Sequence, residues 1–162
     1  MAAQGAVVGV LGRNEQKGNA LIKEIEAEGN KAFFMISDVM DEKSLIKNRE
    51  NIVKQYGKID VLINAAGGNM PGATIGPDKN IFDLKLDDFK TVVDLNLFGT
   101  ALPTSVFAKA MVDSGEGVIV NFSSMSALRP LTRVAGYGAA KAAVSNYTQY
   151  MAGELATKFG EK

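Results

Sequence analysis

Cysteine and histidine are both absent from the 162-residue sequence. Without cysteine no disulfide can form, which fits a reducing compartment. The two absences also remove the commonest ligands of transition metals and leave only carboxylates, so we expect no metal site. Long apolar runs and a signal-peptide pattern are absent as well. We therefore expect a cytoplasmic protein with no membrane partner.

An excess of charge of either sign is also absent. The 18 lysine and arginine residues balance the 18 aspartate and glutamate residues, which gives a formal net charge of zero. Nucleic acids and anionic membranes bind to basic patches, so neither is an expected partner. The length is sufficient for one buried core, and we place residues 1–162 in a single domain.

The apolar pattern alternates between strands and helices along the chain. Short apolar runs that are typical of buried parallel strands occur at 6–11, 32–36, 60–65 and 118–121. Helical patterns occur at 15–28, 41–56, 87–112 and 137–159, and residues 1–5 resemble the last turn of another helix. This alternation predicts an α/β fold with a parallel sheet. The loop at 67–83 is long and rich in glycine and proline, which is typical of a functional loop.

A tyrosine precedes a lysine by four residues in the last predicted helix. Tyr137 and Lys141 would lie on one face of it, about 5–6 Å apart. A nearby ammonium favours the ionised form of a phenol, so Tyr137 could give a proton to a carbonyl oxygen or take one from an alcohol. Ser124 could hold the same oxygen. Taken alone, the pair is also compatible with a surface tyrosine that packs along a lysine stem.

Three further motifs accompany this pair. In chain order they are Asn64-Ala65-Ala66-Gly67 after a strand, Asn96-Leu97-Phe98-Gly99 in a helix, and Asn121-Phe122-Ser123-Ser124 at the end of another strand. Together with the tyrosine–lysine pair they resemble the short-chain dehydrogenase/reductase family. The resemblance covers residues 1–162 and implies a Rossmann-like, doubly wound parallel sheet that binds a dinucleotide.

The resemblance implies catalytic roles for several residues. Tyr137 would be the acid/base, and Lys141 would tune it and hold the nicotinamide ribose. Ser124 would bind the substrate oxygen, with Ser126 as a weaker competitor. Asn96 resembles the helix asparagine whose backbone carbonyl holds a proton-relay water, although a polar residue at a helix kink would look the same.

Other matching residues are expected beside the cofactor. Asn64 would tie the central strands together, and Ala65, Ala66 and Gly67 would pass near the dinucleotide. Ile63 replaces the first asparagine of the family's Asn-Asn-Ala-Gly signature.

The resemblance also places residues at the adenosine end of the cofactor. Asp38 and Val39 match the positions at the adenine ring, although Asp38 could instead cap the following helix. Members that select NAD usually carry an acid at the position of Gly12, and none is present here. Arg13 suits a 2′-phosphate, which favours NADP over NAD. A solvated Arg13 in a site that takes both cofactors is the alternative.

Two parts of the family's domain are missing from the sequence. The first strand with its turn Thr-Gly-x-x-x-Gly-x-Gly, which cradles the pyrophosphate, is absent, and so are the strands after the tyrosine helix. We therefore expect a sheet that is present only in part, without its central strand, and a chain that is a piece of a longer protein. Alone it would leave backbone groups unpaired and bind dinucleotide weakly.

Two arginines favour an anionic substrate. Arg129 and Arg133 lie between Ser124 and Tyr137, in a loop that borders the active-site mouth of this family, and guanidinium pairs well with carboxylate. Surface arginines paired with acids are the alternative. The sequence around Ser124, Tyr137 and 64–74 further resembles members that act on hexuronates, which implies exchange between D-mannonate and D-fructuronate.

Other functions remain open within and outside this enzyme class. A gluconate or polyol dehydrogenase and a 3-oxoacyl-carrier reductase are the alternatives among enzymes. An inactive fragment that serves only assembly is the alternative from another class. The helices at 87–112 and 137–159 usually pair across subunits in this family, which implies a homodimer or homotetramer.

Overall fold

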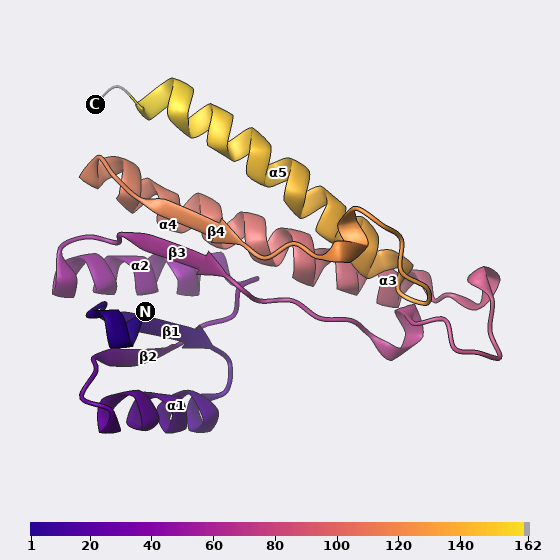
Figure 1. Cartoon of the computed structure of the whole chain (residues 1–162), viewed down its shortest axis with the longest axis horizontal. Helices are drawn as coiled ribbons and strands as arrows, with labels where there is room; N and C mark the ends of the chain where they lie inside the picture. The colour runs from indigo at the N-terminus through magenta and orange to yellow at the C-terminus, as the bar shows by residue number, and fades with distance from the viewer. Residues whose placement is uncertain (161–162) are drawn as a thin grey trace.

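The computed structural model describes residues 1–160, in which helices and strands alternate (Figure 1). The strands are β1 (Val8–Gly12), β2 (Ala32–Ile36), β3 (Val61–Asn64) and β4 (Val118–Asn121). The α-helices are α1 (Glu15–Ala27), α2 (Glu42–Tyr56), α3 (Leu86–Val93), α4 (Gly99–Ser114) and α5 (Ala135–Phe159). Residues 1–5 form a single 3₁₀ turn, Ala2–Gln4, followed by Gly5 in the left-handed conformation.

The strands form two separate parallel pairs. β1 pairs with β2 from Val8↔Ala32 onward, and β3 pairs with β4 from Val61↔Val118 to Asn64↔Asn121. Among residues 1–160 no strand pairing joins one sheet to the other. Figure 1 shows β1 and β3 on the inner sides and β2 and β4 on the outer sides, so the chain winds outward in both directions. The prediction of a Rossmann-like sheet that is present in part is confirmed.

Polar caps set the beginnings of the first two helices. The Asn14 side chain accepts a hydrogen bond from the backbone of Lys17 and starts α1. The Asp41 carboxylate accepts from the backbone of Lys43 and Ser44 and starts α2. The alternative in which Asp38 caps this helix is wrong.

The helix predicted at 87–112 is longer and is interrupted. It runs from Leu86 to Ser114, with a π turn, Asp94–Phe98, between α3 and α4. A π turn inserts an extra residue into the helix and is frequent at functional sites. The sequence indicated a kink at Asn96 only as an alternative, because the apolar pattern continues through this turn.

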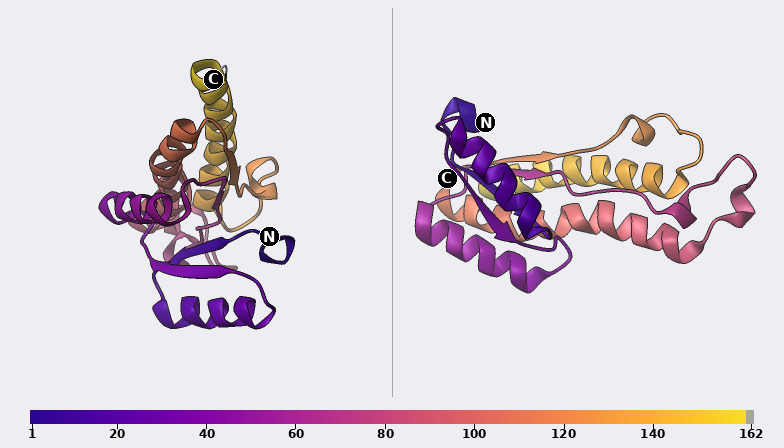
Figure 2. Two further views of the ribbon diagram at one scale, coloured as in Figure 1. Left: turned by 90° about the vertical axis from the view of Figure 1, so that its left-hand side faces the viewer. Right: turned by 90° about the horizontal axis from the view of Figure 1, so that it is seen from below.

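The core lies between the helices and one face of the β3–β4 pair. Leu45, Ile59, Phe107 and Met111 form its buried centre, and Ile119 packs against them. In Figure 2, α2, α4 and α5 lie together, whereas α1 stands apart from them beside β1 and β2.

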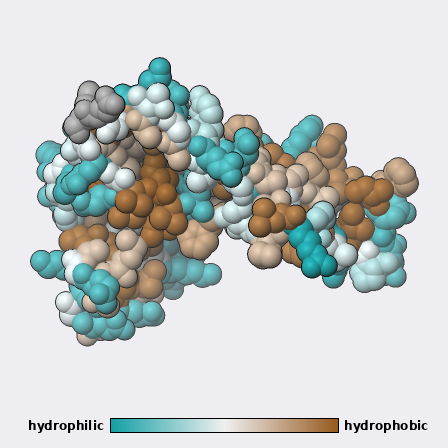
Figure 3. Space-filling model, turned by 45° about the horizontal axis from the view of Figure 1, so that its top comes forward, coloured by the Kyte–Doolittle hydropathy of each residue, from teal (hydrophilic) through white to brown (hydrophobic). Residues whose placement is uncertain are grey.

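The other face of the β3–β4 pair is apolar and open. Val61, Ile63, Val118 and Val120 alternate with inward-facing residues along the two strands, and each is between 38% and 57% exposed. Figure 3 shows a hydrophobic patch on the wider half of the molecule. No helix within residues 1–160 is long and apolar enough to cross a membrane.

Candidate active site

The predicted site residues gather where the strands end. Gly12, Asn64 and Asn121 are the last residues of β1, β3 and β4, and the three arrowheads point the same way in Figure 1. Ligands of open α/β sheets bind in the crevice outside these carboxyl ends, where the winding direction changes. In this chain that change falls between β1 and β3.

Tyr137 and Lys141 lie one turn apart on α5. The Lys141 ammonium lies 5.7 Å from the centre of the Tyr137 ring, within reach of a cation–π contact. It donates a 2.8 Å hydrogen bond to the Phe122 carbonyl, just beyond β4. Lys141 is only 4% exposed, and burial lowers the pKa of its ammonium below the ordinary value. The structure thus holds a buried cation against a half-buried phenol.

Ser124 lies at the start of a 3₁₀ turn that packs on the first turn of α5. Its hydroxyl oxygen accepts hydrogen bonds from the backbone and the hydroxyl of Ser126, at 3.2 and 2.9 Å. Its own proton therefore remains available to another acceptor. Gly138 allows the close packing, because a Cβ there would lie 3.2 Å from the Ser126 carbonyl oxygen. Ser126 is buried and supports Ser124.

Asn96 fixes the start of the loop that follows β3. It is fully buried in the π turn, and its side chain exchanges hydrogen bonds with the backbone of Gly68, at 2.7 and 3.2 Å. A Cβ on Gly67 would lie 2.6 Å from the Asn96 side-chain oxygen and 3.4 Å from the Lys141 nitrogen. Only glycine fits between these two side chains. The Asn96 carbonyl accepts a hydrogen bond from the Thr100 hydroxyl at 3.0 Å.

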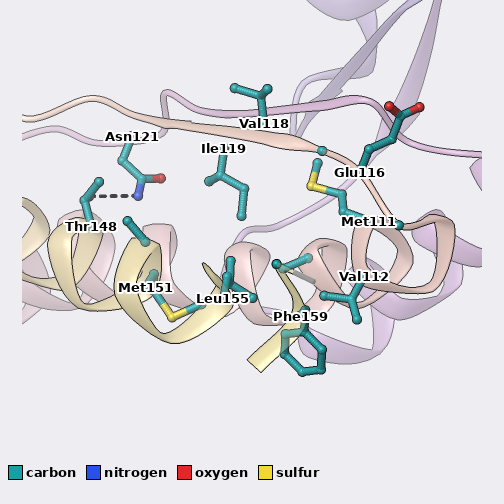
Figure 4. Close-up of a pocket in the computed structure, with 15 residues that line it drawn as sticks. Met111, Val112, Glu116, Val118, Ile119, Asn121, Thr148, Met151, Leu155 and Phe159 are labelled. Carbon is teal, nitrogen blue, oxygen red and sulfur yellow. Dashed lines mark hydrogen bonds between the residues drawn. The ribbon is translucent and has the colours of Figure 1, made fainter. Parts of the chain in front are cut away.

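Asn64 joins the two strands of its sheet and a helix. Its amide nitrogen donates to Asn121 Oδ1 at 2.8 Å and to Thr104 Oγ1 at 2.9 Å. Asn121 in turn donates to Thr148 Oγ1 on α5 at 2.9 Å (Figure 4). This chain of polar contacts holds α4 and α5 against the strands. Sequence reasoning missed Thr104 and Thr148, although Thr148 lies two turns after Lys141 on the same helix.

The predicted adenosine end lies beside β1 and β2. Arg13 is 76% exposed and lies 3.8 Å from the Asp38 carboxylate, which is a weak ion pair. Val39 packs against Gly99, just after the π turn. Ala65 and Ala66 follow β3.

Ser37 also lies at this edge, and sequence reasoning missed it. It is 3% exposed, and its hydroxyl has no hydrogen-bond partner among residues 1–160. A buried hydroxyl without a partner calls for an external polar group. The Ser37 hydroxyl, unpaired in the described part of the chain, and the narrow space at Gly67 together fit a polar, extended ligand such as a dinucleotide.

The two arginines of the β4–α5 loop, residues 122–134, differ in their contacts. The Arg129 side chain makes no hydrogen bond or salt bridge within residues 1–160 and is exposed. Arg133 Nε donates to the Ile75 carbonyl at 3.1 Å. Neither arginine pairs with an acid in the part that the structure describes, so the alternative of surface ion pairs is wrong there.

A groove lies at the other end of α5, away from Tyr137. Apolar side chains from α4, β4 and α5 line it, and Figure 4 shows Met111, Ile119, Met151, Leu155 and Phe159. No predicted catalytic residue reaches it. Among residues 1–160 no group of three acidic side chains is placed to hold a metal ion.

Comparison with known proteins finds a matching family and several relatives of this chain. A family profile described as short chain dehydrogenase matches residues 1–159. UxuB, an uncharacterized oxidoreductase of Bacillus subtilis, is 40% identical over 160 residues, which cover 94% of this chain and 58% of UxuB. The chain therefore spans little more than half the length of this relative.

Solved structures agree with this match. A candidate D-mannonate oxidoreductase from Haemophilus influenzae with bound NAD superposes with a TM-score of 0.88 at 36% identity, covering 96% of this chain and 59% of the other. A metagenomic short-chain oxidoreductase in complex with NADP gives a TM-score of 0.84 at 26% identity, covering 96% and 68%. Proteins with this fold thus bind either dinucleotide.

Proposed function

Because the chain belongs to the short-chain dehydrogenase family, we propose that the complete protein is an oxidoreductase that interconverts a secondary alcohol and a ketone with a nicotinamide dinucleotide. The observation that carries this proposal is the buried Lys141 ammonium, 5.7 Å from the centre of the Tyr137 ring and beside Gly67. A buried cation there stabilises negative charge that develops on the phenol oxygen.

In the reducing direction, a bound nicotinamide dinucleotide would supply the hydride that the ketone carbon accepts. Tyr137 and Ser124 donate hydrogen bonds to the ketone oxygen, and Tyr137 then gives its proton to that oxygen. The products are the alcohol and the phenolate, which Lys141 stabilises. The Asn96 carbonyl would accept a hydrogen bond from the water that returns a proton to the site. In the oxidising direction Tyr137 takes the proton instead.

Residues at the strand ends would hold the cofactor. Asp38, Val39 and Arg13 would contact the adenosine half, and Ser37 would gain a partner there. The segment at 64–67 would pass along the nicotinamide half toward Tyr137 and Lys141.

NADP is the favoured cofactor. The ion pair of Arg13 with Asp38 is long and exposed, so the guanidinium is free to turn to a 2′-phosphate at little cost. The NAD in the Haemophilus structure belongs to a relative of only 36% identity. Replacement of Arg13 by alanine should weaken NADPH binding about tenfold and leave NADH binding unchanged. An unchanged ratio of the two dissociation constants would remove Arg13 from this role.

The proposed substrate is a sugar acid, the D-mannonate/D-fructuronate pair. Either arginine of the β4–α5 loop could anchor a carboxylate, and Arg129 is favoured, because the Nε of Arg133 is already hydrogen-bonded. The name of the Haemophilus relative supports the same substrate.

The test is an assay of the complete protein with D-fructuronate, a neutral ketose and a 3-oxoacyl thioester, followed by the absorbance of the reduced cofactor. We expect turnover of the uronate, and a rise of its KM in Arg129→Ala that the neutral ketose does not share. Preference for the thioester or the ketose would contradict the sugar-acid assignment. Absence of turnover with all three would favour a protein that serves only assembly.

Assembly as a homodimer or homotetramer through α4 and α5 is part of the proposal, as is a cytoplasmic location. Small residues on α5, such as Ala139 and Ala142, are exposed and would let a second helix approach closely. Light scattering of the complete protein tests this: a monomer at micromolar concentration would contradict it.

A further inference from the structure

Two loops far apart in the sequence are joined by a pair of hydrogen bonds between Arg133 and Ile75. The Ile75 N–H donates to the Arg133 carbonyl at 2.9 Å, and Arg133 Nε donates to the Ile75 carbonyl at 3.1 Å. Both backbone groups of Ile75 are therefore paired with one residue. The pattern is that of a bridge between two strands, in which a guanidinium N–H replaces one peptide N–H.

Arg133 adopts a strained backbone conformation in order to make this pair. Its φ is 77°, and it is the one non-glycine residue with a positive φ among residues 1–160. A side chain in the left-handed region clashes with the following carbonyl, so such residues persist only where their surroundings fix them. The two bonds to Ile75 supply that restraint, since they use the backbone and the side chain of Arg133 together.

The bridge connects the two sides of the proposed site. Arg133 precedes Tyr137 by four residues and lies two residues before α5. Ile75 belongs to the β3–α3 loop, residues 65–85, whose first glycines lie against Asn96 and Lys141. The segment at 67–75 therefore runs from the Lys141 side of the site to the beginning of the tyrosine helix.

We infer that Arg133 is a positioning residue, which fixes the β3–α3 loop to the start of α5 and thereby sets the width of the substrate pocket at Tyr137. This inference rests on the proposed function. It assigns to Arg133 a role that depends on the geometry of its Nε, whereas recognition of the substrate carboxylate falls to Arg129. Loss of the bridge should impair all substrates alike.

Two variants break the bridge from opposite sides. Ile75→Pro removes the donor N–H and leaves Arg133 untouched, and Thr74 is already extended, at φ −106° and ψ 121°, as a residue before proline must be. Arg133→Lys keeps the positive charge and loses the Nε donor. Ile75→Val is the matched control, because it keeps the backbone N–H.

In the complete protein we expect Ile75→Pro and Arg133→Lys each to lower kcat/KM about fivefold, for the uronate and for a neutral ketose alike. The double variant should be no worse than the poorer single variant, because both changes break one bridge. The dissociation constant of the cofactor should stay within about twofold. Multiplicative effects, or a defect in Arg133→Lys confined to the uronate, would overturn the inference.

A second readout does not depend on activity. Lys79 and Lys85 are exposed in the β3–α3 loop, so trypsin cleavage after them reports how firmly the loop is held. Both variants should be cleaved there about fivefold faster than the wild type and the Ile75→Val control. Faster cleavage of the variants, in a protein that shows no uronate turnover, would support the bridge but contradict the proposed function. Unchanged cleavage would remove the bridge.

Discussion

Replacement of Asn64 by aspartate is a near-isosteric change that reverses the direction of a buried hydrogen-bond network. Asn64 is 6% exposed, and its amide nitrogen donates to Asn121 at 2.8 Å and to Thr104 at 2.9 Å. A carboxylate at this position has no donor. It would place an oxygen directly against the side-chain oxygen of Asn121.

The magnitude follows from these contacts. Two hydrogen bonds are lost, at about 1 kcal/mol each, and the half-buried Asn121 oxygen is left without its donor, which costs about 1–2 kcal/mol more. We therefore expect Asn64→Asp to lower the free energy of unfolding by about 3–4 kcal/mol at neutral pH. The loss should shrink in acid, because a protonated aspartic acid regains one O–H donor.

Urea unfolding of the complete protein, followed by far-ultraviolet circular dichroism, measures this change. Asn69→Asp is the matched control, because the Asn69 amide also donates to a threonine hydroxyl, at 2.7 Å, but at an exposed position. It should cost less than about 0.5 kcal/mol. Stability of Asn64→Asp within about 1 kcal/mol of the wild type would show that these hydrogen bonds contribute little.

Three further predictions concern single contacts. Gly67→Ala should weaken cofactor binding about tenfold in a titration, because the new Cβ would lie 2.6 Å from the Asn96 side-chain oxygen. Unchanged affinity would show that cofactor binding does not need a glycine at this position. Burial lowers the pKa of Lys141 below its ordinary value of 10.5, so between the lowered pKa and 10.5 the unfolded state binds more protons than the folded state. The stability of the wild type relative to Lys141→Met should therefore rise with pH up to about 10.5. The same pH dependence of stability in both proteins would contradict this. Asp41→Ala should cost about 1 kcal/mol of stability by loss of the α2 cap, and Asp38→Ala less, which chemical denaturation can compare.

Much of the fold could be predicted because its signals are local. Gly57 and Gly115 end α2 and α4 with a positive φ, as their positions in the sequence indicate. The apolar runs located the four strands to within two residues. The pairing of Asn64 with Asn121 follows from the register of β3 and β4, which places the two residues opposite each other.

The remaining features depend on tertiary contacts that no local pattern encodes. The π turn at Asn96 arises within an uninterrupted helical pattern. The bridge of Arg133 with Ile75 joins residues 58 apart in the sequence, and the sequence alone suggested a substrate carboxylate or a surface acid as the partner of Arg133. The burial that lowers the pKa of Lys141 likewise depends on the loops that cover it.

In the proposed reaction Tyr137 transfers the proton while the cofactor transfers hydride, and Tyr137→Phe in the complete protein removes only the proton donor. Cofactor affinity and single-turnover reduction of D-fructuronate should be measured on the same preparation, with Tyr150→Phe, an exposed tyrosine of α5, as the control. We expect a loss of about 10²–10⁴-fold in the rate of reduction, with cofactor affinity within about twofold of the wild type. A rate within tenfold of the wild type would contradict it.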